Sequence, residues 1–203
     1  MMTGPSVNFI FTRNDKSFIS RAIMWFEQRR THKDRRAAHG LMKFWPSGPI
    51  FREDFLSLEA TERGVWMDLY DKSIGQQTVV ANFELDLPDH IADEVIRIAI
   101  ERYNDWYYDF EGVASYAIWI LMKRWFGTLV RLLKFTWKFE VEPGRLFCTG
   151  LLYQIATIAQ EKDPEGRNWV GDIKSSEEAT PRRLIDVCFA SSCYRWKGGA
   201  AKP

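Results

Sequence analysis

Cys148 is the residue whose type and position most directly suggest covalent chemistry. It lies near the front of the segment Pro143–Gln160, whose apolar residues recur at the spacing of one helix face: Cys148, Leu151, Leu152, Ile155, Ile158 and Ala159. Pro143 and Gly144 interrupt the chain before it, so we expect Cys148 in or just before the first turn of a helix. Free backbone N–H groups and the helix dipole favour an anion there, which lowers the pKa of a thiol and makes it a better nucleophile.

A cysteine at this position can also be a simple core residue, because free cysteine is among the most often buried residue types. Its position indicates a nucleophile only if the chain supplies a base and a third polar group that orients this base. Of the three histidines, His32 and His90 lie in strongly polar segments. His39 lies near the start of a predicted strand, where a ring can be held rigidly, and is therefore the best candidate for the base.

Glu59 is the candidate orienting group. It interrupts the apolar pattern of a neighbouring predicted strand, and its carboxylate could accept a hydrogen bond from the ring of His39. Alternation along the two strands does not settle which face either side chain takes. A solvent-facing glutamate is the alternative interpretation.

The order of these residues resembles the circularly permuted papain-fold hydrolases. This group includes the YiiX-like relatives of NlpC-type cell-wall peptidases and, more distantly, lecithin:retinol acyltransferase. The segments that carry the resemblance are Ala38-His39-Gly40, Leu58-Glu59-Ala60, Arg63-Gly64-Val65, Tyr107-Tyr108-Asp109-Phe110, Leu146-Phe147-Cys148-Thr149 and Ala179-Thr180-Pro181. The sequence departs from the usual family pattern at Ala38 and at Thr149-Gly150, and the interval from Asp109 to Cys148 is longer.

The resemblance implies an α+β, papain-like fold in which an antiparallel sheet packs on the helix that bears the nucleophile. It also implies a Cys148–His39–Glu59 triad that hydrolyses or transfers acyl groups through a thioester, most directly on peptide amides of the peptidoglycan type. A lipid acyltransferase or thioesterase is the nearest alternative. A non-catalytic binding or assembly protein on the same fold is the alternative of a different class. The triad requires neither a metal nor an organic cofactor.

The elements that must position the triad follow from periodicity and turn residues. Strands are predicted over residues 7–12, 37–45, 55–60 and 64–69, the last three as an antiparallel meander, with another over 82–87. Helices are predicted over 17–28, over 89–103 with Asp89 as its cap, and from Thr180-Pro181 onward. Residues 103–110 are predicted to form an aromatic loop, and residues 197–203 a frayed tail.

An apolar and basic stretch, residues 113–139, is predicted to be a helical insert. Its basic residues fall in one sector of a helix: Lys123, Arg124, Arg131, Lys134 and Lys138. Such a helix could lie on an anionic membrane surface, cover the active cleft or bind a partner. It could equally be a core helix whose basic side chains reach water.

Composition limits the remaining possibilities. The 203 residues are predicted to form one domain, and a formal charge of +1 argues against a general polyanion binder. The basic run Arg29–Arg36 could touch phosphate, but it lacks interleaved aromatic residues, so no nucleic-acid partner is expected. Three cysteines without a CxxC pair favour free thiols in a reducing compartment. With no signal peptide or membrane span in view, we expect a cytoplasmic protein that could associate peripherally with a membrane.

Overall fold

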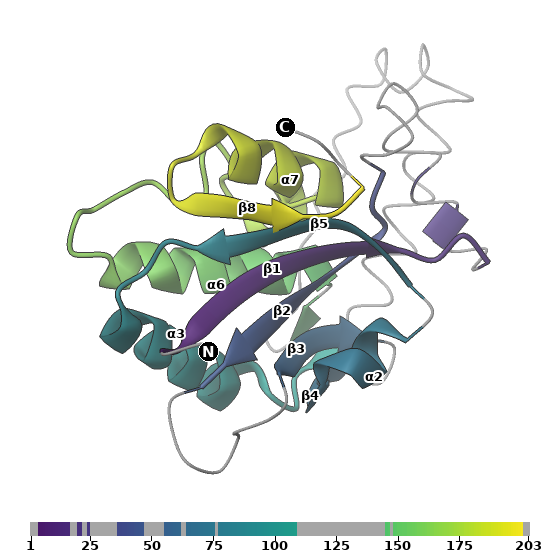
Figure 1. Cartoon of the computed structure of the whole chain (residues 1–203), viewed down its shortest axis with the longest axis horizontal. Coiled ribbons are helices and arrows are strands. Elements are labelled where there is room, and N and C mark those ends of the chain that lie inside the picture. The colour runs from purple at the N-terminus through teal and green to yellow at the C-terminus, as the bar shows by residue number, and fades with distance from the viewer. Residues whose placement is uncertain are drawn as a thin grey trace, which may run out of the picture.

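The computed structural model is an α+β fold built around a six-stranded antiparallel sheet (Figure 1). It describes residues 4–16, 20–21, 24, 36–46, 55–61, 64–75, 77–108, 145–146 and 148–200. The strand order is β4-β3-β2-β1-β5-β8. The bounds are β1 Ser6–Arg13, β2 His39–Trp45, β3 Leu56–Thr61, β4 Gly64–Leu69, β5 Thr78–Leu85 and β8 Tyr194–Gly198.

The helices α3, α6 and α7 begin close to the residues at which the sequence predicts helix starts. Their bounds are α2 Tyr70–Ile74, α3 Asp89–Tyr103, α6 Cys148–Lys162 and α7 Pro181–Ala190, with a short 3-10 helix over Ser176–Glu178. Pro181 occupies the start of α7, and the Thr180 hydroxyl caps it by accepting a hydrogen bond from the Arg183 N–H. Within the part of the chain that the structure describes, no helix combines the length and apolar character that a membrane span requires.

The core lies between one face of the sheet and helices α3 and α6, which lie beside and behind the strands in Figure 1. Alternate residues of β1 to β3 point into it, as the period of two predicts: Val7, Phe9, Phe11, Met42, Phe44, Leu56, Leu58 and Ala60. The apolar face of α6 is buried against them, and all six residues predicted for that face are buried. The prediction of an antiparallel sheet packed on the Cys148 helix is confirmed.

Four local predictions were wrong. Asp89 does not cap α3, because Pro88 is the N-cap and Asp89 is the first helical residue. β5 begins at Thr78 and ends at Leu85, since its residues up to Glu84 pair with β1 around a bulge and Leu85 pairs with Tyr194 of β8. Tyr107–Tyr108 is not loop but a short strand, β6, which pairs in parallel with β7, Arg145–Leu146. The tail prediction fails at Lys197 and Gly198, which belong to β8.

β8 forms because β5 offers it a free edge. Phe83 pairs with Trp196 in the antiparallel register, and Lys197 makes a 2.7 Å ion pair with Glu84. These partners are far from β8 in the sequence, so composition alone could not indicate them.

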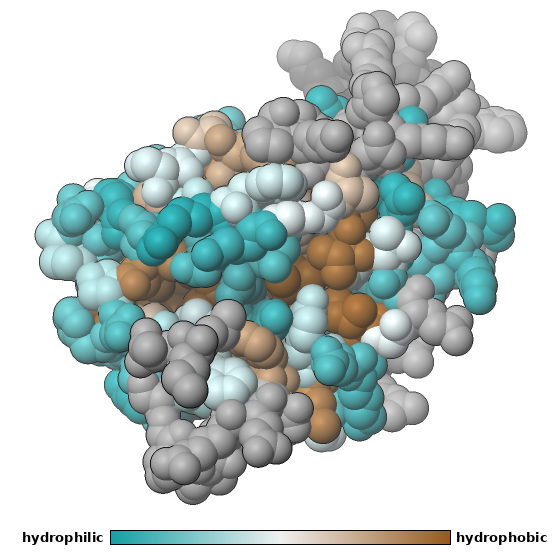
Figure 2. All heavy atoms as spheres, in the orientation of Figure 1, coloured by the Kyte–Doolittle hydropathy of each residue, from teal (hydrophilic) through white to brown (hydrophobic). Residues whose placement is uncertain are grey.

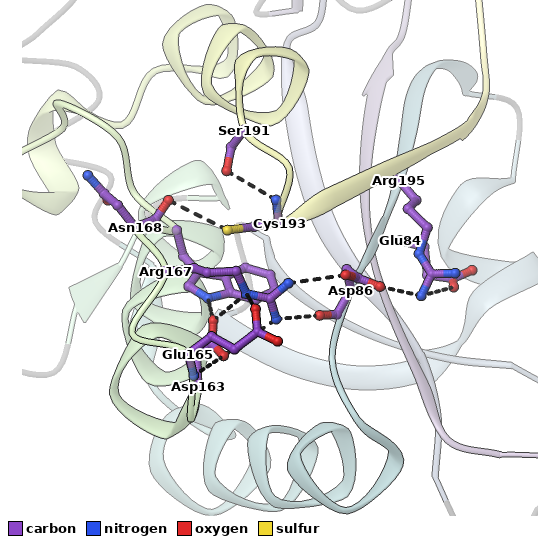
Figure 3. A network of polar contacts seen from close by, with 10 residues as sticks. Glu84, Asp86, Asp163, Glu165, Arg167, Asn168, Ser191, Cys193 and Arg195 are labelled. Carbon is purple, nitrogen blue, oxygen red and sulfur yellow. Dashed lines mark hydrogen bonds and ion pairs between the residues drawn. The ribbon is translucent and has the colours of Figure 1, made fainter.

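A polar network joins the far end of α6 to the sheet (Figure 3). Arg167 lies between Asp163, directly after α6, and Asp86, directly after β5. Its Nε donates to Asp163 Oδ2 at 2.7 Å, and another guanidinium nitrogen donates to the Asp86 carbonyl at 2.8 Å. The Trp169 indole also donates to Asp163, at 2.8 Å. This network fixes the direction of α6 at the end opposite Cys148.

Hydrophobic residues gather across the middle of the face shown in Figure 2, with hydrophilic side chains around them. The exposed large hydrophobic residues of the described chain are Trp66, Met67, Leu69, Tyr107 and Trp196. Most of the helix predicted over 17–28, most of the Arg29–Arg36 run and the whole 113–139 insert lie outside the described residues. Their predicted roles, including membrane contact through Lys123, Arg124, Arg131, Lys134 and Lys138, stay predictions.

Candidate active site

His39 and Glu59 lie side by side on neighbouring strands. His39 is the first residue of β2, and the register pairs Leu41 of β2 with Glu59 of β3. Since alternate residues share a face, His39 and Glu59 are diagonal neighbours on one side of the sheet. His39 Nε2 lies 3.1 Å from Glu59 Oε2, and the two side chains are 21% and 12% exposed. The carboxylate therefore orients the ring, while part of the imidazole is accessible.

Cys148 lies close to His39 and Glu59 because the start of β2 and the first turn of α6 pack closely together. A Cβ atom on Gly40 would lie 3.2 Å from Thr149 Cγ2 and 2.8 Å from Leu152 Cδ1. The missing side chain of Gly40 thus leaves room for the start of α6 beside the start of β2. Cys148, as the first residue of α6, is thereby placed next to His39.

Burial by itself would lower the pKa of His39, but this effect is outweighed. A hydrogen bond and charge attraction to Cys148, followed by the same two interactions with Glu59, raise the pKa of His39 to about 10. The imidazole is therefore protonated at neutral pH. It can hold a negative charge on the sulfur and later deliver a proton.

Burial by itself would raise the pKa of the Cys148 thiol, and this effect is also outweighed. A hydrogen bond and charge attraction to His39 lower the pKa of Cys148, and the backbone N–H groups of Gly40 and Thr149 lower it further by donating to the sulfur. The opposite directions of the two shifts have one cause, since contact between the two side chains favours the charged form of each, the thiolate and the imidazolium. Cys148 is buried, with 8% of its surface exposed.

The other two cysteines have no such environment. Cys188 and Cys193 are buried free thiols, as predicted, and burial raises the pKa of Cys188 well above its usual value. His90 is exposed at the start of α3, whereas His32 lies outside the described residues. No group of three or more His, Cys, Asp or Glu side chains that could hold a metal ion occurs in the described ranges.

The structure thus brings together all three residues predicted from the sequence. Sequence reasoning missed Gly40, although a glycine inside a predicted strand is a signal of close backbone approach. It also missed Trp66 of β4, which lies directly opposite Glu59 in the β3–β4 register. The Thr149 N–H could be anticipated only as one of the free donors of a helix start.

A shallow hollow of about 440 Å³ lies elsewhere, between the later turns of α3 and α6, where Ile98, Arg102, Ile158 and Lys162 line it. Ile158 is ten residues after Cys148 on α6, which is about 15 Å at the helical rise. This hollow is therefore separate from Cys148 and His39.

Comparison of the chain with protein-family models, with curated proteins and with solved structures finds no match.

Proposed function

We propose that this protein is a cysteine-dependent acyl hydrolase or acyltransferase that works through a thioester on Cys148. The observation that supports this proposal best is the coupled Cys148–His39 pair, in which contact lowers the pKa of the thiol and raises that of the imidazole. Glu59, 3.1 Å from the ring, completes the order nucleophile, base and orienting group. Three segments far apart in the sequence supply these groups.

In the proposed first step, the Cys148 thiolate attacks the acyl carbon, and the carbonyl oxygen takes up the electron pair as an oxyanion. The positive N-terminus of α6 and the backbone N–H of Cys148 lower the energy of that charge. Collapse of the intermediate breaks the bond to the leaving group, which takes the proton from His39. A thioester and a neutral imidazole are left on the protein.

In the second step, His39 removes a proton from water or from another acceptor, which attacks the thioester carbon. The Cys148–acyl bond breaks, and the sulfur leaves as the thiolate beside an imidazolium again. Glu59 holds the ring in one orientation through both steps, because its carboxylate accepts a hydrogen bond from His39 Nε2.

The substrate class is taken from the resemblance to permuted papain-fold hydrolases. A peptide amide of the peptidoglycan type is the first candidate. A lipid acyl ester or thioester is the alternative, which the apolar insert predicted over residues 113–139 would favour if it lines the cleft. Along the chain, the strand with His39 comes first, the strand with Glu59 second and the helix with Cys148 last, and this order agrees with either substrate class.

The test is single-turnover acylation with p-nitrophenyl acetate at neutral pH, followed by mass spectrometry of peptides. The expected result is a rapid release of p-nitrophenolate equal to the protein concentration, with the acetyl group on Cys148 alone. His39→Ala is expected to abolish the burst, while His90→Ala, an exposed histidine on α3, is expected to keep it. Slow acetylation of all three cysteines, unchanged by His39→Ala, would favour a binding protein instead.

A panel of acyl donors then separates the substrate classes. Faster turnover of an acylated dipeptide amide than of a long-chain thioester supports the peptidase assignment, and the reverse order supports the lipid one. Added hydroxylamine distinguishes transfer from hydrolysis, because it intercepts the thioester as a hydroxamate.

A further inference from the structure

Trp66 lies next to Glu59 of the proposed triad, on the face of the sheet that carries Glu59 and His39. The β3–β4 register pairs it directly with Glu59, and directly paired residues have Cβ atoms about 5 Å apart on one face. Glu59 in turn contacts His39. Trp66 is 48% exposed, although a large aromatic side chain on a strand is usually buried more deeply. The exposed indole of Trp66 therefore lies directly beside the more buried side chains of His39 and Glu59.

Backbone hydrogen bonds connect the strand of Trp66, through two further segments, with the segment that precedes Cys148. The Val65 N–H donates to the Trp106 carbonyl at 2.7 Å, and the Asp105 N–H donates to the Val65 carbonyl at 2.9 Å. Tyr107 follows directly in β6, which pairs with β7, the strand that ends two residues before Cys148. β2, β3, β4, β6 and β7 thus form a connected series from His39 to the nucleophile. Trp66 lies on this series between Glu59 and Cys148.

The backbone holds the indole close to β4. Gly64 has a φ of +116°, and a Cβ atom on it would lie 2.7 Å from the Trp106 carbonyl oxygen and 3.3 Å from Trp66 Nε1. A residue other than glycine would be strained in this conformation and would collide with the Trp106 carbonyl. The close packing at Gly64 leaves the Trp66 ring against its own strand.

We propose that Trp66 determines substrate specificity by binding a flat apolar group, such as an aromatic ring, of the acyl substrate. This inference rests on the proposed function and specifies the substrate of that site. Strands about 4.8 Å apart place β4 about 10 Å from β2, so the bound group lies roughly that far from the strand that carries His39. The indole offers such a group a large apolar surface that costs little conformational entropy to use.

The test compares two alkylating probes of Cys148, N-ethyliodoacetamide and N-(2-phenylethyl)iodoacetamide, which differ by a phenyl ring placed beyond the reactive carbon. Free cysteine in solution gives the intrinsic ratio of the two rates. The native protein is expected to favour the phenyl probe by about three- to tenfold above that ratio, as expected for one aromatic contact. Trp66→Ala is expected to remove this preference, while Trp66→Phe is expected to retain it.

Trp196→Ala is the matched control, since Trp196 is 40% exposed on β8, the opposite edge strand of the same sheet. It is expected to leave the preference unchanged. Equal preferences in the native protein and Trp66→Ala would overturn the assignment of Trp66 while Cys148 could still be highly reactive. A Cys148 that reacts with both probes as slowly as an ordinary thiol would instead overturn the proposed function. Thermal unfolding of each variant shows whether it is folded.

Discussion

A Cβ atom added to Gly40 would lie 2.8 Å from Leu152 Cδ1, a distance that real Cβ atoms do not adopt. Gly40 directly follows His39, and Leu152 lies one turn after Cys148, so this contact sets how closely the base and the nucleophile approach. Leu152 is fully buried, which leaves its methyl group little space to move away.

Gly40→Ala is therefore expected to push the first turn of α6 away from β2. The overpacked contact should lower the free energy of unfolding by about 1–3 kcal/mol. The alkylation rate of Cys148 at pH 7 should also fall, because the thiolate loses its close contact with His39. Urea unfolding and iodoacetamide kinetics measure the two effects. Native reactivity in a stably folded Gly40→Ala protein would show that this contact does not set the geometry of the pair.

The pH dependence of Cys148 alkylation tests the ion pair itself. An ordinary cysteine is only a few per cent thiolate at pH 7, and its alkylation rate rises steeply toward pH 9. Contact with His39 lowers the pKa of Cys148, and His39 stays protonated until about pH 10. We therefore expect the alkylation rate of Cys148 to level off at a lower pH than that of an ordinary cysteine, and hydrolysis to decline as His39 loses its proton near pH 10.

In His39→Ala, burial is no longer opposed by the imidazolium, so the pKa of Cys148 should rise above its usual value. Its alkylation at pH 7 is expected to fall at least about tenfold, the effect of one pKa unit. Cys188 provides an internal control, since burial raises its pKa and it should remain unlabelled. A Cys148 rate that rises with pH in the same way as that of free cysteine would contradict the stabilisation of the thiolate by His39.

Glu59→Gln tests the orienting role without a change in side-chain size. Glu59 raises the pKa of His39 through a hydrogen bond and its charge, so the amide should lower that pKa. Turnover is expected to fall about ten- to a hundredfold, as is typical when a residue that orients a functional histidine is replaced. NMR titration of the His39 ring and steady-state kinetics measure the two quantities.

Glu84→Gln is the control for this comparison, because Glu84, which pairs with Lys197, lies on β5, three strands away from the β3 strand of Glu59. It removes one negative charge from a strand without touching His39, so the His39 titration should not change. Equal shifts in both variants would mean that the His39 pKa responds to the general charge of the sheet.

Much of the fold follows from local patterns, because the residues that form β1 to β4 and α6 carry their own periodicity. The alternation of Val7, Phe9 and Phe11 predicts one buried face of a strand without knowledge of its partners. β8 carries no comparable signal, since three of its five residues are exposed and it is held by pairing with β5. Pairing between distant segments is a tertiary property that a single sequence does not contain.

In the candidate active site, too, the residue types can be predicted from the sequence, whereas their contacts cannot. A cysteine at a helix start, a histidine at a strand start and a glutamate in an apolar strand can each be found by type and position. Their contact depends on the register that pairs Leu41 with Glu59 and on the approach of α6 at Gly40. Alternation cannot fix the register between two strands, so the sequence could place the three residues in order but not in contact.

The Asp163–Arg167 network predicts how stability depends on acid. Burial would raise the pKa of Asp163, but hydrogen bonds from Arg167 and Trp169 outweigh it and lower that pKa from 3.8 to about 2. A carboxyl with a lower pKa in the folded state stabilises the fold fully above its unfolded value. This stabilisation is lost as the pH falls through about 4 to 2. The free energy of unfolding should decrease accordingly over that interval.

Asp163→Asn should remove this part of the pH dependence, so that the stability of the variant changes less between pH 4 and pH 2. At pH 7 the variant should be less stable by about 2–3 kcal/mol, because the indole N–H of Trp169 and the Arg167 guanidinium lose a charged acceptor. Asp172→Asn, at an aspartate that is 84% exposed, is the control and should keep the native pH profile. Since the network fixes the far end of α6, a native pH profile in Asp163→Asn would mean that another carboxylate anchors this helix.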